Sequence, residues 1–141
     1  MPDALKLQYI VAGDDFTLAG TASSEVKKLL RQLGASPDVI RKVAISMYEG
    51  EINMVIHANG GVIDVEISPE HVAMVLTDQG PGIPDIEAAM REGFSTAPDT
   101  VRSLGFGAGM GLPNMKKYSD SLEIDSVVGV GTTIRMTVDM K

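Results

Sequence analysis

Glycine is concentrated in one part of this chain, and the concentration limits where regular structure can form. Of the 15 glycines in the 141 residues, seven lie between residues 79 and 111: Gly80, Gly82, Gly93, Gly105, Gly107, Gly109 and Gly111. Glycine weakens helices and strands because it loses the most conformational freedom on folding. The segment therefore predicts loops, interrupted by a short helical piece near residues 85–91, and the core must come from the sequence on either side.

The flanking sequence carries both helical and strand patterns. Apolar residues spaced three and four apart predict helices over about 19–33 and 37–59, the second with Ser36 as N-cap, and a third helix is expected over 110–118. Alternation predicts strands over about 5–11, 62–68, 72–78, 122–126 and 134–138, the last four joined mostly as hairpins. This order favours an α+β fold, a two-layer sandwich with helices covering one face of a mixed sheet.

Length and charge restrict the class of protein. The length fits a single domain over residues 1–141, and 12 basic against 19 acidic residues give a net charge of −7. That charge argues against nucleic-acid binding, which needs a basic face. The chain has no cysteine, no apolar run near the roughly 18 residues of a membrane span, and no amino-terminal signal pattern. We therefore expect a cytoplasmic protein with no membrane partner.

The second expected helix carries a polar stripe formed by Glu49, Asn53 and His57. Residues four apart are offset by only about 40° around a helix, so the three share one face. Glu49 could accept a proton from a hydroxyl, and the Asn53 side-chain oxygen could bind a hard cation such as Mg²⁺. A plain polar surface is the alternative, and Glu51 is a competing candidate for the base. The interior Gly50 suggests close approach of a ligand or of backbone.

Two further segments have the composition of a nucleotide site. Asp78 ends a strand and is followed by Gly80 and Gly82. Its carboxylate could accept a hydrogen bond from the exocyclic amine of adenine, and the glycines would let the backbone approach the base. An ordinary turn has the same composition. The glycine run at residues 105–111 could direct backbone N–H groups at an anion, helped by the helix that follows. Near the end of the chain, the Thr132 hydroxyl could contact a base or its bound water.

The order of these motifs resembles the GHKL ATPase superfamily, which includes gyrase, heat-shock protein 90 and the histidine kinases. Helix Glu-x-x-x-Asn, strand Asp-x-Gly-x-Gly, the glycine loop and the closing Gly-Thr follow one another as the family's boxes do. The resemblance runs from about Ser36 to Met140, and in size the chain looks like the small anti-sigma-factor and switch-protein serine kinases. Two departures are Gly105, which leaves the glycine-loop register open by two residues, and Asn114, where close relatives often have glycine.

The resemblance implies a Bergerat-type ATP site with assigned residues. Glu49 would be the general base, Asn53 would hold Mg²⁺, Asp78 would bind the adenine amine and Thr132 would support that contact. A lid would span residues 83–104. The remaining nucleotide-binding residues implied by the resemblance are Gly80, Gly82 and Ile83 near the base, and Gly107, Gly109, Met110, Gly111 and Leu112 along the phosphates.

The resemblance also implies a function and partners. The chain would be an ATP-dependent serine/threonine kinase that uses ATP and Mg²⁺ to phosphorylate a small STAS-type antagonist or switch protein. A sigma factor is a possible second partner, and similar kinases form homodimers. Two alternatives stay open: a non-catalytic module that binds a partner according to whether ATP or ADP is bound, and a detached ATP-binding domain of a histidine kinase.

Overall fold

The computed structural model describes residues 5–13, 20–58, 60–83 and 111–140. The chain forms β1 (Leu5–Ala12), α1 (Thr21–Gln32), α2 (Pro37–His57), β2 (Gly60–Ile67), β3 (His71–Asp78), α5 (Gly111–Tyr118), β4 (Ser121–Val127) and β5 (Gly131–Asp139). The strands and the three helices expected on either side of the glycine-rich segment are confirmed. The helical piece expected near residues 85–91 lies outside the described residues.

The five strands form one sheet in the order β1-β2-β3-β5-β4. All four neighbouring pairs are antiparallel, so the expectation of a mixed sheet is wrong for the described strands. The reason is the place of β5. Strands β3 and β4 run in the same direction, but β5 forms a hairpin with β4 and lies between the two. The long connection after β3 therefore joins strands that are not neighbours, and no parallel ladder forms.

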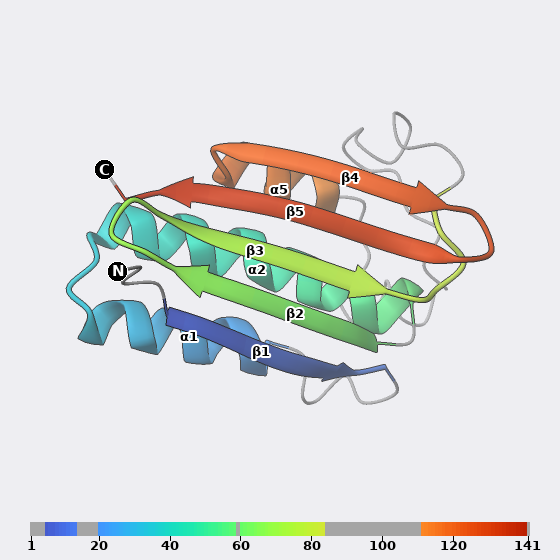
Figure 1. Ribbon diagram of the computed structural model, residues 1–141, viewed down its shortest axis with the longest axis horizontal. Coiled ribbons are helices and arrows are strands. Elements are labelled where there is room, and N and C mark those ends of the chain that lie inside the picture. Colours follow the sequence, from blue (N-terminus) through green and yellow to red (C-terminus); the bar gives the residue numbers. More distant parts are fainter. Residues whose placement is uncertain (1–4, 14–19, 59, 84–110, 141) are drawn as a thin grey trace.

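The three helices cover one face of the sheet, as the sequence predicts (Figure 1). Helix α2 lies in the middle of this layer, with contacts to α1 on one side, to α5 on the other, and to strands of the sheet beneath. The core between the layers is aliphatic and rich in methionine. Its largest fully buried side chains include Leu30, Met47, Ile63, Met74, Leu76, Met115 and Met136.

Helix α2 begins where the sequence predicts. The Ser36 hydroxyl accepts a hydrogen bond from the backbone N–H of Val39 at 3.2 Å, and Pro37 occupies the first turn. Asp38 follows in that turn, where a negative charge favours the helix dipole. No helix in the described part of the chain combines the length and apolarity needed to cross a membrane.

The interior glycine of α2 permits close packing on the sheet. A Cβ atom at Gly50 would lie 2.3 Å from Cδ2 of Leu76, a buried side chain of β3. Gly50 is itself buried, and the space over it is filled by the core. The close approach expected from the sequence therefore exists, and the neighbour is a side chain of β3 rather than a ligand.

We expect Gly50→Ala to lower the free energy of unfolding by up to about 2 kcal/mol, because overpacking a filled core costs about 1–3 kcal/mol. The roughly 1 kcal/mol that alanine gains in helix propensity opposes this loss. Urea unfolding followed by circular dichroism measures the balance. Ser24→Ala, at an exposed position of α1, is the matched control. A Gly50→Ala protein about 1 kcal/mol more stable than the wild type, the gain that helix propensity alone gives, would contradict the packing role.

Candidate functional site

Asp78 and Thr132 lie opposite one another at the ends of β3 and β5. The Oδ1 atom of Asp78 accepts hydrogen bonds from the backbone N–H groups of Gly80 at 3.0 Å and Thr132 at 3.2 Å. These two bonds fix the orientation of a half-buried carboxylate. Its other oxygen, Oδ2, accepts no hydrogen bond from the described residues, so it is available to an amine donor of a ligand.

Thr132 and Ser126 connect this end of the sheet to the loop after β3. The Oγ atoms of Ser126 and Thr132 lie 2.8 Å apart, and Thr132 is 6% exposed. Ser126 Oγ also accepts the backbone N–H of Ile83 at 2.7 Å. The Thr132 hydroxyl therefore bonds to Ser126 in this structure. Sequence reasoning missed Ser126, although it is the polar member of the alternating set Leu122, Ile124 and Ser126.

Two glycines of the Asp-x-Gly-x-Gly motif are required by backbone packing. A Cβ atom at Gly80 would lie 2.6 Å from Cα of Ala58, just beyond the end of α2. Gly82 has a φ of 81°, and a Cβ there would lie 2.7 Å from the carbonyl oxygen of Val127. The loop is thus packed between the end of α2 and the β4–β5 turn, which holds Asp78 and Ile83 at this edge.

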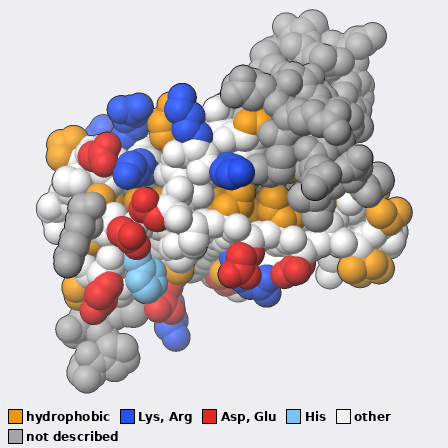
Figure 2. Space-filling model, turned by 90° about the horizontal axis from the view of Figure 1, so that it is seen from above, with side chains coloured by type: hydrophobic (Ala, Val, Ile, Leu, Met, Phe, Trp, Pro, Cys, Tyr) orange, Lys and Arg blue, Asp and Glu red, His pale blue; other side chains and the backbone are white. Residues whose placement is uncertain are grey.

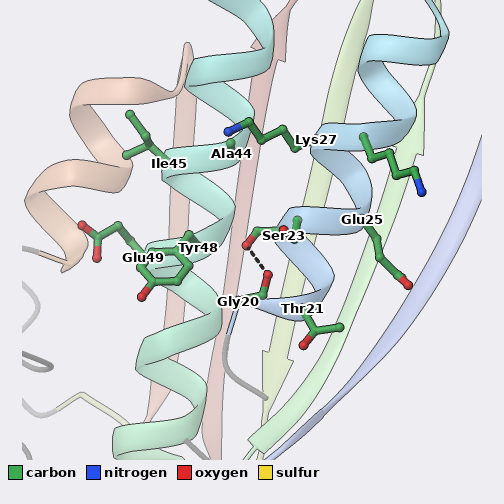
Figure 3. A pocket seen from close by; sticks show the side chains of 11 residues that line it. Gly20, Thr21, Ser23, Glu25, Lys27, Ala44, Ile45, Tyr48 and Glu49 are labelled. Atoms are coloured by element: carbon green, nitrogen blue, oxygen red, sulfur yellow. Dashed lines mark hydrogen bonds between the residues drawn. The ribbon is translucent and has the colours of Figure 1, made fainter. Parts of the chain in front are cut away.

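The second part of the candidate site lies on α2. Glu49 and Asn53 are one turn apart and both are half-buried. The Asn114 side-chain amide, on α5, donates a hydrogen bond to Oε2 of Glu49. Figure 3 shows the Glu49 carboxylate directed to the side of α2 that faces α5, next to the Tyr48 ring. Asn114 was noted in the sequence only as a departure from relatives, and its contact with Glu49 depends on helix packing that spacing does not reveal.

Glu51 has a structural role that excludes it as a competing base. Its side chain is 2% exposed and accepts the backbone N–H groups of Gly20, Ala22 and Ser23 at 3.0–3.1 Å. Gly20 is the N-cap residue of α1 and has no side chain with which to cap the helix. Glu51 satisfies these orphan N–H groups and places its negative charge at the positive end of the α1 dipole.

The predicted phosphate-binding residues are only partly described. Gly111 is the first residue of α5, and the Leu112 side chain is buried in the core, which leaves only the Leu112 backbone for a ligand. Gly107, Gly109 and Met110 lie outside the described residues, as does the expected lid beyond Ile83. In the described part of the chain, no group of three His, Cys, Asp or Glu side chains could hold a metal ion.

The five-stranded sheet covered on one face by three helices is an α+β domain. Residues 14–138 match the family model of the histidine kinase-like ATPase domain. The match covers most of the chain, so the protein belongs to this family.

Two relatives and one solved structure describe the similarity further. The chain is 30% identical to an anti-sigma F factor of Bacillus licheniformis over 97% of this chain and 92% of the relative. It is 31% identical to the serine/threonine-protein kinase RsbT of Bacillus subtilis, covering 77% and 79% respectively. The crystal structure of the RsbU and RsbW domains of a Mycobacterium tuberculosis protein superposes with a TM-score of 0.65 at 16% identity. It matches 95% of this chain, which spans 32% of that longer chain.

We expect Glu51→Gln to destabilise the protein by about 2 kcal/mol, because the amide loses the charge and one of the two acceptor oxygens that satisfy the start of α1. Urea unfolding measures the change. Glu25→Gln, which removes an exposed carboxylate from α1 itself, serves as the control. Equal unfolding midpoints for the two variants would be incompatible with the capping role.

Proposed function

We propose that this protein is an ATP-dependent serine/threonine kinase that phosphorylates a small STAS-type regulatory protein. The observation that carries the proposal is the pair Glu49 and Asn53, one turn apart on α2, with Asn114 donating to the Glu49 carboxylate. The kinase named among the relatives supports the same reaction. A sigma factor is a second proposed partner, supported by the relatives named anti-sigma F factor.

In the proposed complex the adenine amine donates to Oδ2 of Asp78, whose other oxygen is already held by Gly80 and Thr132. The amide oxygen of Asn53 suits Mg²⁺, a hard cation that protein sites usually bind through few side chains together with phosphate oxygens. Bound Mg²⁺ would neutralise charge on the phosphates during transfer. The start of α5 at Gly111 offers backbone N–H groups to the phosphates.

Glu49 then acts as the general base. It accepts the proton of a serine or threonine hydroxyl as that oxygen forms a bond to the γ-phosphorus and the bond from the γ-phosphorus to ADP breaks. Asn114 keeps the carboxylate oriented by donating to Oε2. Asn114 is thus a positioning residue, since it acts through Glu49.

Homodimerisation is a further proposal for the amino-terminal strand. β1 lies at the edge of the sheet and pairs only with β2 among the described strands. Ile10 on this strand is 82% exposed. An unpaired strand edge carrying an exposed aliphatic side chain is suited to contact with a second copy.

ATP with Mg²⁺ should raise the melting temperature, because a ligand present at about 100 times its dissociation constant adds about 2.7 kcal/mol to the free energy of unfolding. Asp78→Asn should lose most of this shift, because an amide in place of the carboxylate can turn its NH₂ group toward the adenine amine. Thermal unfolding with ATP, and with GTP for comparison, makes the measurement. Asp64→Asn, an exposed carboxylate on β2, is the control. An unchanged ATP shift in Asp78→Asn would refute the adenine contact.

Glu49→Gln should slow phosphotransfer from labelled ATP to a STAS-domain protein by a factor of about 10² or more, the usual contribution of a general base. The ATP-induced melting shift should be retained. Asn114→Ala should lower kcat less, leave the KM for ATP unchanged and alter the pH profile of kcat, because the base loses its hydrogen-bond donor.

A Glu49→Gln protein as active as the wild type would eliminate Glu49 as the base. Partner binding that switches between ATP and ADP without any transfer would favour the non-catalytic module. Phosphate found on an imidazole rather than a hydroxyl would favour the detached histidine kinase domain.

A further inference from the structure

Basic side chains gather on the helix layer of this acidic protein. Seven Lys and Arg residues lie on the three helices, and all are exposed or half-buried: Lys27, Lys28, Arg31, Arg41, Lys42, Lys116 and Lys117. The acidic residues of these helices are Glu25, Asp38, Glu49 and the buried Glu51. The outer surface of the helix layer is therefore net positive although the chain carries −7.

The sheet layer has the opposite charge. Among its described residues only Lys6 and Arg135 are basic, whereas eight are acidic: Asp64, Glu66, Glu70, Asp78, Asp120, Glu123, Asp125 and Asp139. Figure 2, which looks onto the molecule from the β4 side, shows most Lys and Arg side chains along the helix side and most Asp and Glu side chains along the sheet side. The described helices and strands are thus electrostatically polarised across the two layers.

The helix-layer cations are largely unneutralised. Of these seven cations, only Lys42 forms an ion pair with a described residue, Asp38, at 3.4 Å. Arg41 and Lys117 both lie over the Tyr118 ring, 5.5 and 5.4 Å from its centre. A hydrogen bond from Arg41, followed by the charge of Lys117, lowers the pKa of the Tyr118 phenol. Neither cation forms an ion pair with a described carboxylate, which leaves their charge available to a partner.

A groove runs between α1 and α2 on this basic layer. Its volume is about 940 Å³. Glu25, Lys27 and Lys28 are its charged lining residues from α1, and Ala44, Ile45 and Tyr48 line it from α2. Figure 3 shows Lys27 extended from α1 toward α2, and Glu25 directed away from α2. Glu49 also lines the groove, while its carboxylate is directed to the side of α2 that faces α5.

We propose that this groove, the α1–α2 groove, docks an acidic segment of the protein substrate. The inference rests on the proposed kinase function and names the chemistry of its partner. An apolar side chain of the segment packs on Ile45 and Tyr48, and flanking Asp or Glu residues approach Lys27 and Lys28. The positive helix layer attracts such a partner while the acidic sheet face repels it, so the encounter is oriented with the groove toward the substrate.

Two fluorescent peptides test the docking without any chemistry. Each carries one Leu and one Ser; one has flanking Glu residues, and the other has Lys at the same positions. In fluorescence anisotropy the Glu peptide should bind, with an affinity that falls as salt screens the charges, and the Lys peptide should not. The double variant K27E/K28E should weaken binding at least about tenfold. The variant K6E/R135E, which removes the same charge from the sheet layer, should bind as the wild type does.

Nuclear magnetic resonance gives the location, since the Glu peptide should shift the backbone amide signals of Ala44 and Ile45. Equal binding of both peptides, or equal loss in the two double variants, would overturn the docking proposal. Thermal unfolding of both double variants confirms that they are folded.

Phosphotransfer to a STAS-domain protein separates this proposal from the kinase proposal. K27E/K28E should raise the KM for the protein substrate, while kcat and the KM for ATP stay unchanged. Wild-type KM values in this variant would remove the docking role and leave the kinase assignment intact. If the Glu peptide binds at the α1–α2 groove in a salt-sensitive way but no variant transfers phosphate, the docking role stands and the kinase assignment fails.

Discussion

The architecture depends on how closely α2 approaches the sheet, and Gly50 sets that distance. At this position a Cβ would overlap Leu76 of β3, so a larger residue would push the central helix away from the core. Helix α2 contacts both other helices of the layer. A change in its height over the sheet would therefore displace α1 and α5 as well, and interiors this tightly packed transmit such shifts.

The residues next to Gly50 show how one turn of helix organises three elements. Successive residues of a helix point about 100° apart. Glu49 accordingly reaches Asn114 on α5, Gly50 faces β3, and Glu51 caps the start of α1. Asn53 follows on the same helix, one turn after Glu49. The position of the proposed base is thus coupled to the packing of the helix layer and not to a loop alone.

The other half of the proposed site depends on strand register. Asp78 and Thr132 are partners across β3 and β5, and Ser126 and Thr132 are partners across β4 and β5. The register brings a carboxylate and two hydroxyls from three strands to one edge of the sheet. The loop that carries Ile83 is fixed there by its bond to Ser126.

The sequence by itself determined the elements, the α+β class and the order of the site motifs, because periodicity, capping and strand-end residues act locally. The N-cap at Ser36 and the strand ending at Asp78 are of this kind. Only the tertiary structure decided that the described sheet is fully antiparallel, since that depends on β5 lying between β3 and β4. It also decided that Glu51 is a cap and that Asn114 contacts Glu49. The partners in these contacts are 28 to 65 residues apart, and nothing in local spacing specifies which of two nearby glutamates faces which neighbouring helix.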